Sequence, residues 1–268
     1  MSDDLGTPHL RFERRGPLGW CIIDRPESRN ALTSRMYFGI RRAVDLVNTD
    51  PALHALVITG VGDVFCPGGD LRREAQQADS ASANIDVGQL IGNDILPFKS
   101  IRQSYAPVIS AINGICQGGG LMIAMLSDIA VASERATFRG PELLRGIVDT
   151  YYAQILPAHI GVALTRDLMF TGRRLNAEEA VRHGLISRMA RHEDLEAAAE
   201  QAAREILQSA PEARMQFKRI VNASYGLIDE VTFAASLKGP EVREGMAAFT
   251  EKRSPSWVPE AFRKNERL

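Results

Sequence analysis

The chain has 268 residues, of which 45% are hydrophobic and 24% are charged, with a formal net charge of −1. A chain of this length can bury a core that needs no disulfide or metal support. The balanced charge excludes a general electrostatic attraction for nucleic acid or an anionic membrane, so any phosphate group must be bound by a few local residues.

The cysteines and the N-terminal segment indicate the cellular compartment in which the protein is expected. Cys21, Cys66 and Cys116 are widely separated and lack the paired spacing of a zinc site or a redox motif. The first residues are acidic where a secretory signal would be basic, and the longest apolar run, residues 121–126, is too short to span a bilayer. We expect a complete cytoplasmic protein that binds no metal, no nucleic acid and no membrane.

The first half of the chain alternates short apolar runs with segments of helical periodicity. The predicted elements are, in order, a hairpin over residues 10–13 and 20–23, a helix over 33–50, a strand over 56–59, a helix between 87 and 103, a strand over 107–112, a helix from about 121 and a strand over 129–132. This alternation predicts an α/β fold with parallel strands.

The last third of the chain is mainly helical. Asn176 with Glu179 matches a capping box, Gly184 ends that short helix, and residues 185–188 predict one more strand. The helices predicted after it span residues 193–208, 211–222, 228–237 and 242–252. We expect a core over residues 1–200 and a C-terminal helical region over residues 201–268.

Two glycine-rich loops are the first candidates for chemistry. Residues 65–70 (FCPGGD) follow one predicted strand, and Gly118-Gly119-Gly120 follows another and begins an apolar helix. Glycines at strand ends leave backbone N–H groups unshielded, and a helix N-terminus adds partial positive charge. The loops therefore either form an oxyanion hole or only make tight turns. Neither matches a P-loop or a dinucleotide fingerprint.

A set of motifs in a fixed order identifies a family. The motifs are Arg25-Pro26 with Asn30-Ala31-Leu32, Val57-Ile58-Thr59-Gly60, Val64-Phe65-Cys66-Pro67-Gly68-Gly69-Asp70-Leu71, Pro107-Val108-Ile109-Ser110-Ala111-Ile112-Asn113-Gly114, Gly118-Gly119-Gly120, Ser127-Asp128-Ile129, the segment 138–142, Glu244-Gly245-Met246 and the segment 249–253. Together they resemble the enoyl-CoA hydratase/isomerase (crotonase) superfamily over nearly the whole chain. The resemblance implies a spiral of ββα units with a C-terminal helical region, assembled as a homo-trimer or homo-hexamer.

The resemblance also implies an acyl-CoA substrate, with no cofactor beyond the coenzyme A that is part of it. The two oxyanion donors of the family fall on the N–H groups of Gly69 and Gly119. The positions that resemble the family's CoA and acyl site are Arg29, Ala31, Gly68, Asp70, Leu71 and Tyr151, with Lys252 or Arg253 near the phosphates. Tyr151 and Tyr152 either shape the acyl pocket or serve only for packing.

The catalytic carboxylates depart from the pattern of hydratases, which use two glutamates. Glu142 matches the second, whereas the first position holds Met122, which can neither ionise nor activate water. Apart from the family, Glu142 would be an acid at a helix N-terminus. Asp149 resembles the aspartate that isomerase-like and dehalogenase-like members carry in this loop; the alternative is a cap for the following helix.

These residues leave several activities open. The leading hypothesis is proton transfer on an enoyl-CoA thioester, either double-bond isomerisation or hydration, through an oxyanion-stabilised enolate. Glu142 is its first acid or base and Asp149 its second. One alternative is a hydrolase or carbon–carbon lyase that uses Asp149, and another is a catalytically silent acyl-CoA-binding protein.

Overall fold

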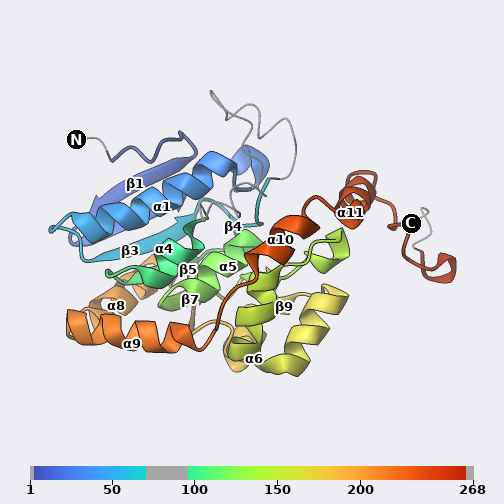
Figure 1. Cartoon of the computed structure of the whole chain (residues 1–268). Helices are drawn as coiled ribbons and strands as arrows, with labels where there is room; N and C mark the ends of the chain where they lie inside the picture. The colour runs from blue at the N-terminus through green and yellow to red at the C-terminus, as the bar shows by residue number, and fades with distance from the viewer. Residues whose placement is uncertain (1–2, 71–95, 264–268) are drawn as a thin grey trace.

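The larger of two sheets carries the predicted strands. The computed structural model describes residues 3–70 and 96–263 (Figure 1). A six-stranded sheet has the order β1-β2-β3-β5-β7-β10. Its strands are β1 (Leu10–Arg15), β2 (Leu18–Ile23), β3 (Ala55–Gly60), β5 (Val108–Ile112), β7 (Ile129–Ser133) and β10 (Arg188–Ala190). Only β1 and β2 pair antiparallel, as the predicted hairpin, and the other neighbours are parallel. The α/β prediction is confirmed.

The second sheet is smaller and consists of very short strands. It contains β4 (Val64–Cys66), β6 (Ile115–Gln117), β8 (Thr137–Arg139) and β9 (Leu175–Asn176), and β4, β6 and β8 are parallel. Each of these three follows a long strand of the larger sheet, which gives the two strands of a ββα unit. Three residues are too few to carry a strand period, so sequence patterning did not find them.

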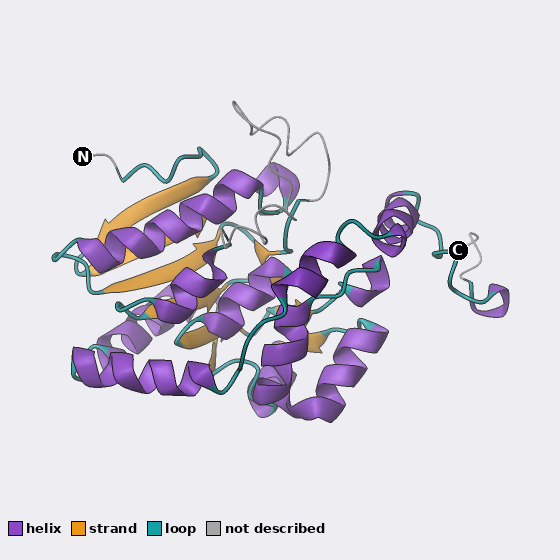
Figure 2. Cartoon of the chain, in the orientation of Figure 1, coloured by secondary structure: helices purple, strands orange, loops and turns teal. Residues whose placement is uncertain are grey.

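The helices lie around the two sheets (Figure 2). They are α1 (Ser34–Thr49), α4 (Pro97–Gln103), α5 (Gly119–Leu126), α6 (Thr150–Thr171), α7 (Ala177–Arg182), α8 (Leu195–Ile206), α9 (Pro211–Ala223), α10 (Glu230–Ser236) and α11 (Pro240–Thr250). Short 3-10 helices span Pro26–Ser28, Leu143–Arg145, His192–Asp194 and Glu260–Phe262. None of the described helices is long and apolar enough to cross a membrane.

The two faces of the larger sheet bury different residues, as the alternation of side chains along a strand requires. Trp20, Val57 and Val131 pack on one face against the alanines of α8, including Ala199 and Ala203. The alternating residues of the same strands belong to the main core, which also takes in α1, α4 and α5. Helices α1, α4 and α5 therefore cover one face of the larger sheet, and the smaller sheet packs into the core on that same face.

One predicted strand begins later in the chain than expected, and one predicted helix lies partly outside the described residues. The strand expected over residues 185–188 is β10, at Arg188–Ala190. Leu185 and Ile186 are buried, but their N–H groups donate to the carbonyl of Ala180, so they close the end of α7 and cannot join the sheet. The helix expected between residues 87 and 103 is α4, which starts at Pro97, and residues 87–95 lie outside the described ranges.

Candidate active site

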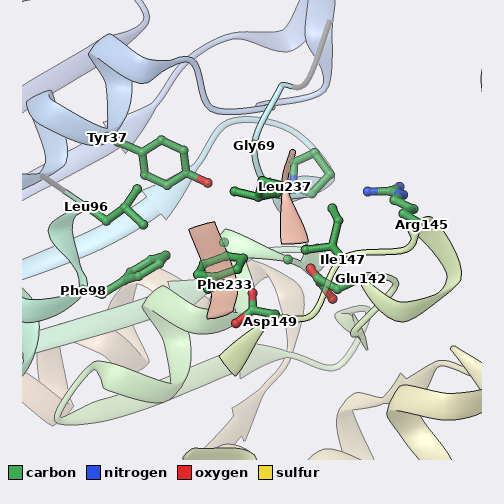
Figure 3. A pocket seen from close by; sticks show the side chains of 14 residues that line it. Tyr37, Gly69, Leu96, Phe98, Glu142, Arg145, Ile147, Asp149, Phe233 and Leu237 are labelled. Atoms are coloured by element: carbon green, nitrogen blue, oxygen red, sulfur yellow. The ribbon is translucent and has the colours of Figure 1, made fainter. Parts of the chain in front are cut away.

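The ends of three neighbouring parallel strands meet at one cavity. Strand β4 leads into Pro67, Gly68 and Gly69, β6 leads into Gly118, and β8 leads towards Glu142. A small cavity of about 70 Å³ lies at this edge (Figure 3). It is lined by Tyr37, Pro67, Gly68, Gly69, Leu96, Phe98, Gly118, Gly119, Glu142, Arg145, Ile147, Asp149, Phe233 and Leu237. Ligands of α/β proteins commonly bind at the carboxyl ends of parallel strands.

The two glycine loops touch each other at the cavity. Gly68 has φ of 104° and Gly118 has φ of 53°, a region that side chains other than glycine rarely adopt. A Cβ atom on Gly68 would lie 3.3 Å from the backbone nitrogen of Gly119. Both positions therefore need glycine, for conformation and for the close approach of the two backbones.

Among the described residues, the hydrogen bonds around the loops leave two N–H groups available. The Leu32 N–H donates to the Gly68 carbonyl at 2.9 Å, and the Asp70 N–H donates to the Leu32 carbonyl at 2.8 Å. In this parallel bridge the N–H of the intervening Gly69 points away from Leu32. Gly119 is the first residue of α5, so the helix supplies no acceptor for its N–H.

A tyrosine holds the second glycine loop by a hydrogen bond from the side of the loop that faces away from the cavity. The Tyr152 hydroxyl donates to the carbonyl of Gly118 at 2.7 Å, and the N–H of Met122 donates to the same carbonyl at 3.0 Å. Met122 itself is buried in α5 and does not line the cavity. The carbonyl of the loop is thus held on the helix side, while Gly119 faces the cavity.

Two carboxyl groups share the cavity. Glu142 is 8% exposed, and its Oε2 atom has no hydrogen-bond partner in the described part of the chain. Asp149 is the N-cap of α6, where its Oδ1 atom accepts from the N–H groups of Tyr151 at 3.0 Å and Tyr152 at 3.2 Å. The capping role considered for Asp149 is confirmed, and the same side chain also lines the cavity.

The cavity changes the acidity of these groups. Burial raises the pKa of Glu142, and the nearby charge of Asp149 raises it further. Burial also raises the pKa of Asp149, although its two backbone hydrogen bonds act in the opposite direction. Burial lowers the pKa of Arg145, which also lines the cavity, while the charge of Glu142 opposes that change. The two carboxyls therefore hold a proton at a higher pH than free carboxyls do.

Aromatic rings form the other wall. The rings of Tyr37, Phe98, Tyr151 and Phe233 follow one another edge to face, with centroid separations of 6.2, 5.2 and 6.1 Å. Tyr151 stands behind the cavity lining, and its hydroxyl donates to Glu230 at 2.8 Å. The Tyr37 hydroxyl lies so close to Gly119 that a Cβ atom there would collide with it.

Several of these wall residues were not found from the sequence. Tyr37 lies beside the apolar stripe of the helix that was predicted over residues 33–50, and Phe98 lies in the predicted second helix. Phe233 and Leu237 are four residues apart, which predicts one helix face but not what that face contacts. Their place in the cavity depends on α10 packing beside α6, a contact between distant segments.

Known proteins resemble the chain over almost its whole length. A sequence profile of the family described as enoyl-CoA hydratase/isomerase matches residues 18–260. The chain belongs to this family. A carnitinyl-CoA dehydratase of Salmonella arizonae is 32% identical over 92% of this chain and 97% of its own. A mevalonyl-coenzyme A hydratase of Aspergillus fumigatus is 33% identical over 94% of this chain and 93% of its own.

Solved structures agree with the family. An enoyl-CoA hydratase/isomerase from Pseudoalteromonas atlantica is 28% identical and superposes with a TM-score of 0.80, covering 93% of this chain and 100% of that one. A carnitinyl-CoA hydratase from Mycobacterium avium is 29% identical with a TM-score of 0.78, covering 94% of this chain and 99% of that one. The expected ββα spiral of the family is confirmed, and the protein is an acyl-CoA enzyme of the enoyl-CoA hydratase/isomerase family.

The residues that family resemblance assigns to the CoA site support the first loop. The Arg25 guanidinium donates to the carbonyl of Ala31 at 2.9 Å and to the carboxylate of Asp70 at 2.8 Å. Arg29 has φ of 52°, so the backbone turns sharply just before Ala31. Arg29, Ala31 and Asp70 do not line the cavity, and Leu71 lies outside the described residues. Their contact with CoA stays a prediction.

The two basic residues near the C-terminus lie after α11. Arg253 forms ion pairs with Glu244 at 2.6 Å and with Glu251 at 2.5 Å, and Lys252 has φ of 55°. Neither lines the cavity. A role in binding the CoA phosphates, as in the family, also stays a prediction.

Proposed function

We propose that this enzyme adds water to an enoyl-CoA thioester, or removes it from the corresponding 3-hydroxyacyl thioester, through an enolate. One observation carries the proposal. The carboxyl groups of Glu142 and Asp149 share one cavity with Gly69 and Gly119, whose backbone N–H groups are free to bind a thioester oxygen. This set supplies both parts that α-proton transfer needs, an acid–base pair and a site for the oxyanion.

The glycine N–H groups would bind the thioester oxygen as negative charge develops on it. Removing the α-proton leaves an enolate, which backbone donors stabilise more than they stabilise the neutral carbonyl. The Tyr37 hydroxyl supports the same task, because it lines the cavity beside Gly119. Burial keeps the pKa of Tyr37 well above its usual value, so the hydroxyl retains its proton and can donate it.

The paired carboxyls would divide the proton transfers between them. Because both pKa values are raised, the pair can hold one proton near neutral pH. Glu142 holds this proton, because its pKa is the more strongly raised and Asp149 accepts two backbone hydrogen bonds. In the hydration direction, ionised Asp149 takes a proton from water as the water oxygen adds to the β-carbon and the enolate forms. Protonated Glu142 then gives its proton to the α-carbon, and dehydration runs the same steps in reverse.

Double-bond isomerisation is the second candidate, because the resemblance of the motifs implies that Met122 replaces the first glutamate of the family's hydratases. One carboxyl would remove a proton at one carbon and return it at another, with no water added. Substrate turnover in deuterated water separates the two activities. Hydration places deuterium at the α-carbon together with a new hydroxyl, whereas isomerisation places deuterium at the α- or γ-carbon and leaves the product unhydrated.

The test is a turnover screen with short, branched and aromatic enoyl-CoAs, followed by mass and NMR analysis of the products. We expect Glu142→Gln to lower kcat by about 10²- to 10⁴-fold, the usual range for loss of a general acid or base, and Asp149→Asn to do likewise. Glu193→Gln, on the exposed surface, is the control. Full deuterium exchange in both active-site variants would contradict the assignment, and a trapped acyl-aspartyl adduct would instead favour hydrolytic or lyase chemistry by Asp149.

We further propose a cytoplasmic homo-trimer or homo-hexamer that needs no cofactor beyond the CoA of its substrate. Three free, buried cysteines, Cys21, Cys66 and Cys116, support a reducing compartment. Phe217 and Ile220 on α9 are 70% and 73% exposed, which supports a contact between subunits.

A further inference from the structure

Arg145 is the basic residue among those that line the cavity. It ends the 3-10 helix Leu143–Arg145, three residues after Glu142. Within residues 3–70 and 96–263, its guanidinium has no hydrogen bond and no ion pair. It lies over the ring of Phe249, with 4.7 Å between the guanidinium carbon and the ring centroid.

Two other arginines of the described chain are neutralised by carboxylates. Arg25 pairs with Asp70 at 2.8 Å, and Arg253 pairs with Glu244 at 2.6 Å. Removing a cation from water without a partner costs free energy, and the face of an aromatic ring compensates for only part of that cost. An anionic ligand group in the cavity would supply the missing partner.

The direction of the side chain agrees with this role. In Figure 3 the guanidinium of Arg145 faces the inside of the cavity, on the side opposite Leu96 and Phe98. Glu142 and Asp149 lie between these two sides. The cavity thus has a cationic end and an apolar end, with the reacting groups between them. A thioester held at the glycine loops would extend one of its two arms towards Arg145.

We propose that Arg145 binds an anionic oxygen group of the substrate, which makes acyl-CoA thioesters with a second carboxylate the preferred substrate class. This inference rests on the proposed function for the thioester itself. The anion could come from the acyl group or from a CoA phosphate. The acyl group is favoured, because the long uncharged pantetheine arm separates the phosphates from the thioester, whereas Arg145 shares a cavity with the reacting carboxyls. The planar guanidinium suits bidentate binding of a carboxylate.

The test measures binding and needs no turnover. Glutaryl-CoA and pentanoyl-CoA have five-carbon acyl chains that differ in the terminal carboxylate, and calorimetry gives the affinity of each for the wild-type enzyme, Arg145→Gln and Arg145→Lys. Arg243→Gln, on the exposed side of α11, is the matched control. We expect the wild type to prefer glutaryl-CoA, and Arg145→Gln to weaken glutaryl-CoA binding by about 10- to 100-fold while pentanoyl-CoA changes by less than about twofold.

Three outcomes would overturn the proposal. One is a wild-type enzyme with no preference for glutaryl-CoA, and another is an equal loss for both thioesters in Arg145→Gln. If that equal loss disappears with the 3′-dephospho-CoA thioesters, the anion is the CoA phosphate. The third is full glutaryl-CoA affinity in a folded Arg145→Gln variant. Arg145→Lys, which keeps the charge but loses the planar fork, should lie between the wild type and Arg145→Gln. A preference for glutaryl-CoA in the binding measurement, together with no hydration of any enoyl-CoA in the turnover screen, would sink the proposed function but leave this inference intact.

Discussion

Asp149 has two tasks that affect stability in opposite directions. It caps α6 through hydrogen bonds from two N–H groups, which stabilises the folded protein. Its burial also raises its pKa above the unfolded value, so the folded state holds a proton that the unfolded state releases. Stability from this group must therefore fall as the pH rises from the ordinary aspartate pKa towards the raised one. The residue that we propose as a catalytic group therefore weakens the fold at neutral pH.

Replacing the Asp149 carboxyl with an amide should remove this pH-dependent loss of stability. Asp149→Asn keeps the cap but cannot ionise, so we expect its melting temperature to exceed that of the wild type, by a margin that grows from about pH 4 to about pH 7. Asp149→Ala is the comparison, because it also loses the cap, at about 1 kcal/mol. Thermal melts at several pH values provide the measurement. A difference in melting temperature that does not change with pH would show that burial of the Asp149 carboxyl does not affect stability.

At the residue scale, sequence reasoning found groups whose chemistry is local and missed those that packing brings in. Gly69, Gly119, Glu142 and Asp149 stand in motifs, and all four line one cavity. The sequence did not identify Arg145 as a site residue, although it lies three residues after Glu142. Its proposed role depends on its guanidinium having no carboxylate partner among the described residues. That property belongs to the folded surroundings and leaves no pattern in the chain.

Among the elements, the first glycine loop depends on a buried ion pair. Arg25 joins the carboxylate of Asp70 to the carbonyl of Ala31, and Leu32 bonds to the loop on both sides of Gly69. The pair is almost fully buried, with side chains 9% and 3% exposed. Removing one partner of such a pair leaves an uncompensated charge in the interior.

We therefore expect Asp70→Asn to lower the free energy of unfolding by about 3 kcal/mol. The double variant Arg25→Gln with Asp70→Asn should cost less than the sum of the two single changes, because the stranded charge is gone. Glu178→Gln, which breaks the exposed pair with Arg182, serves as the control and should cost less than about 0.5 kcal/mol. Additive losses in chemical denaturation would show that the two residues act independently.

Helices with a clear apolar stripe were predicted to within two residues at each end, whereas the short strands were not. Thr33 caps α1, and Asp50 follows its last residue, as the sequence indicates. Strand β4 has three residues, and its presence depends on pairing with β6, which lies about fifty residues away in the chain. Such pairing is decided by tertiary contacts, since so few residues carry no period of their own.

On the scale of the whole molecule, exposed apolar side chains gather in the C-terminal region. Phe217 and Ile220 on α9 stand largely in solvent, as do Leu227 and Val231 before and within α10. Single exposed apolar residues are ordinary, but a group of them near one another is typical of a subunit contact.

If α9 lies at a subunit contact, Phe217→Asp together with Ile220→Asp should shift the enzyme from an oligomer towards the monomer. Light scattering after size-exclusion chromatography measures the mass, and circular dichroism checks the fold. Gln201→Asp, at an exposed site on α8, is the control for added charge. An unchanged oligomer would place the contact elsewhere on the molecule.

The first turn of α6 joins three parts of the enzyme in four residues. Asp149 begins the turn and faces the cavity, Tyr151 supports the aromatic wall, and Tyr152 holds the carbonyl of Gly118. A displacement of this turn would move the Asp149 carboxyl, the aromatic wall and the second glycine loop together. Evolution cannot then adjust one of them here independently of the others. New substrate specificity is easier to gain from Phe233 in α10 and from Leu237 just after it, which belong only to the wall.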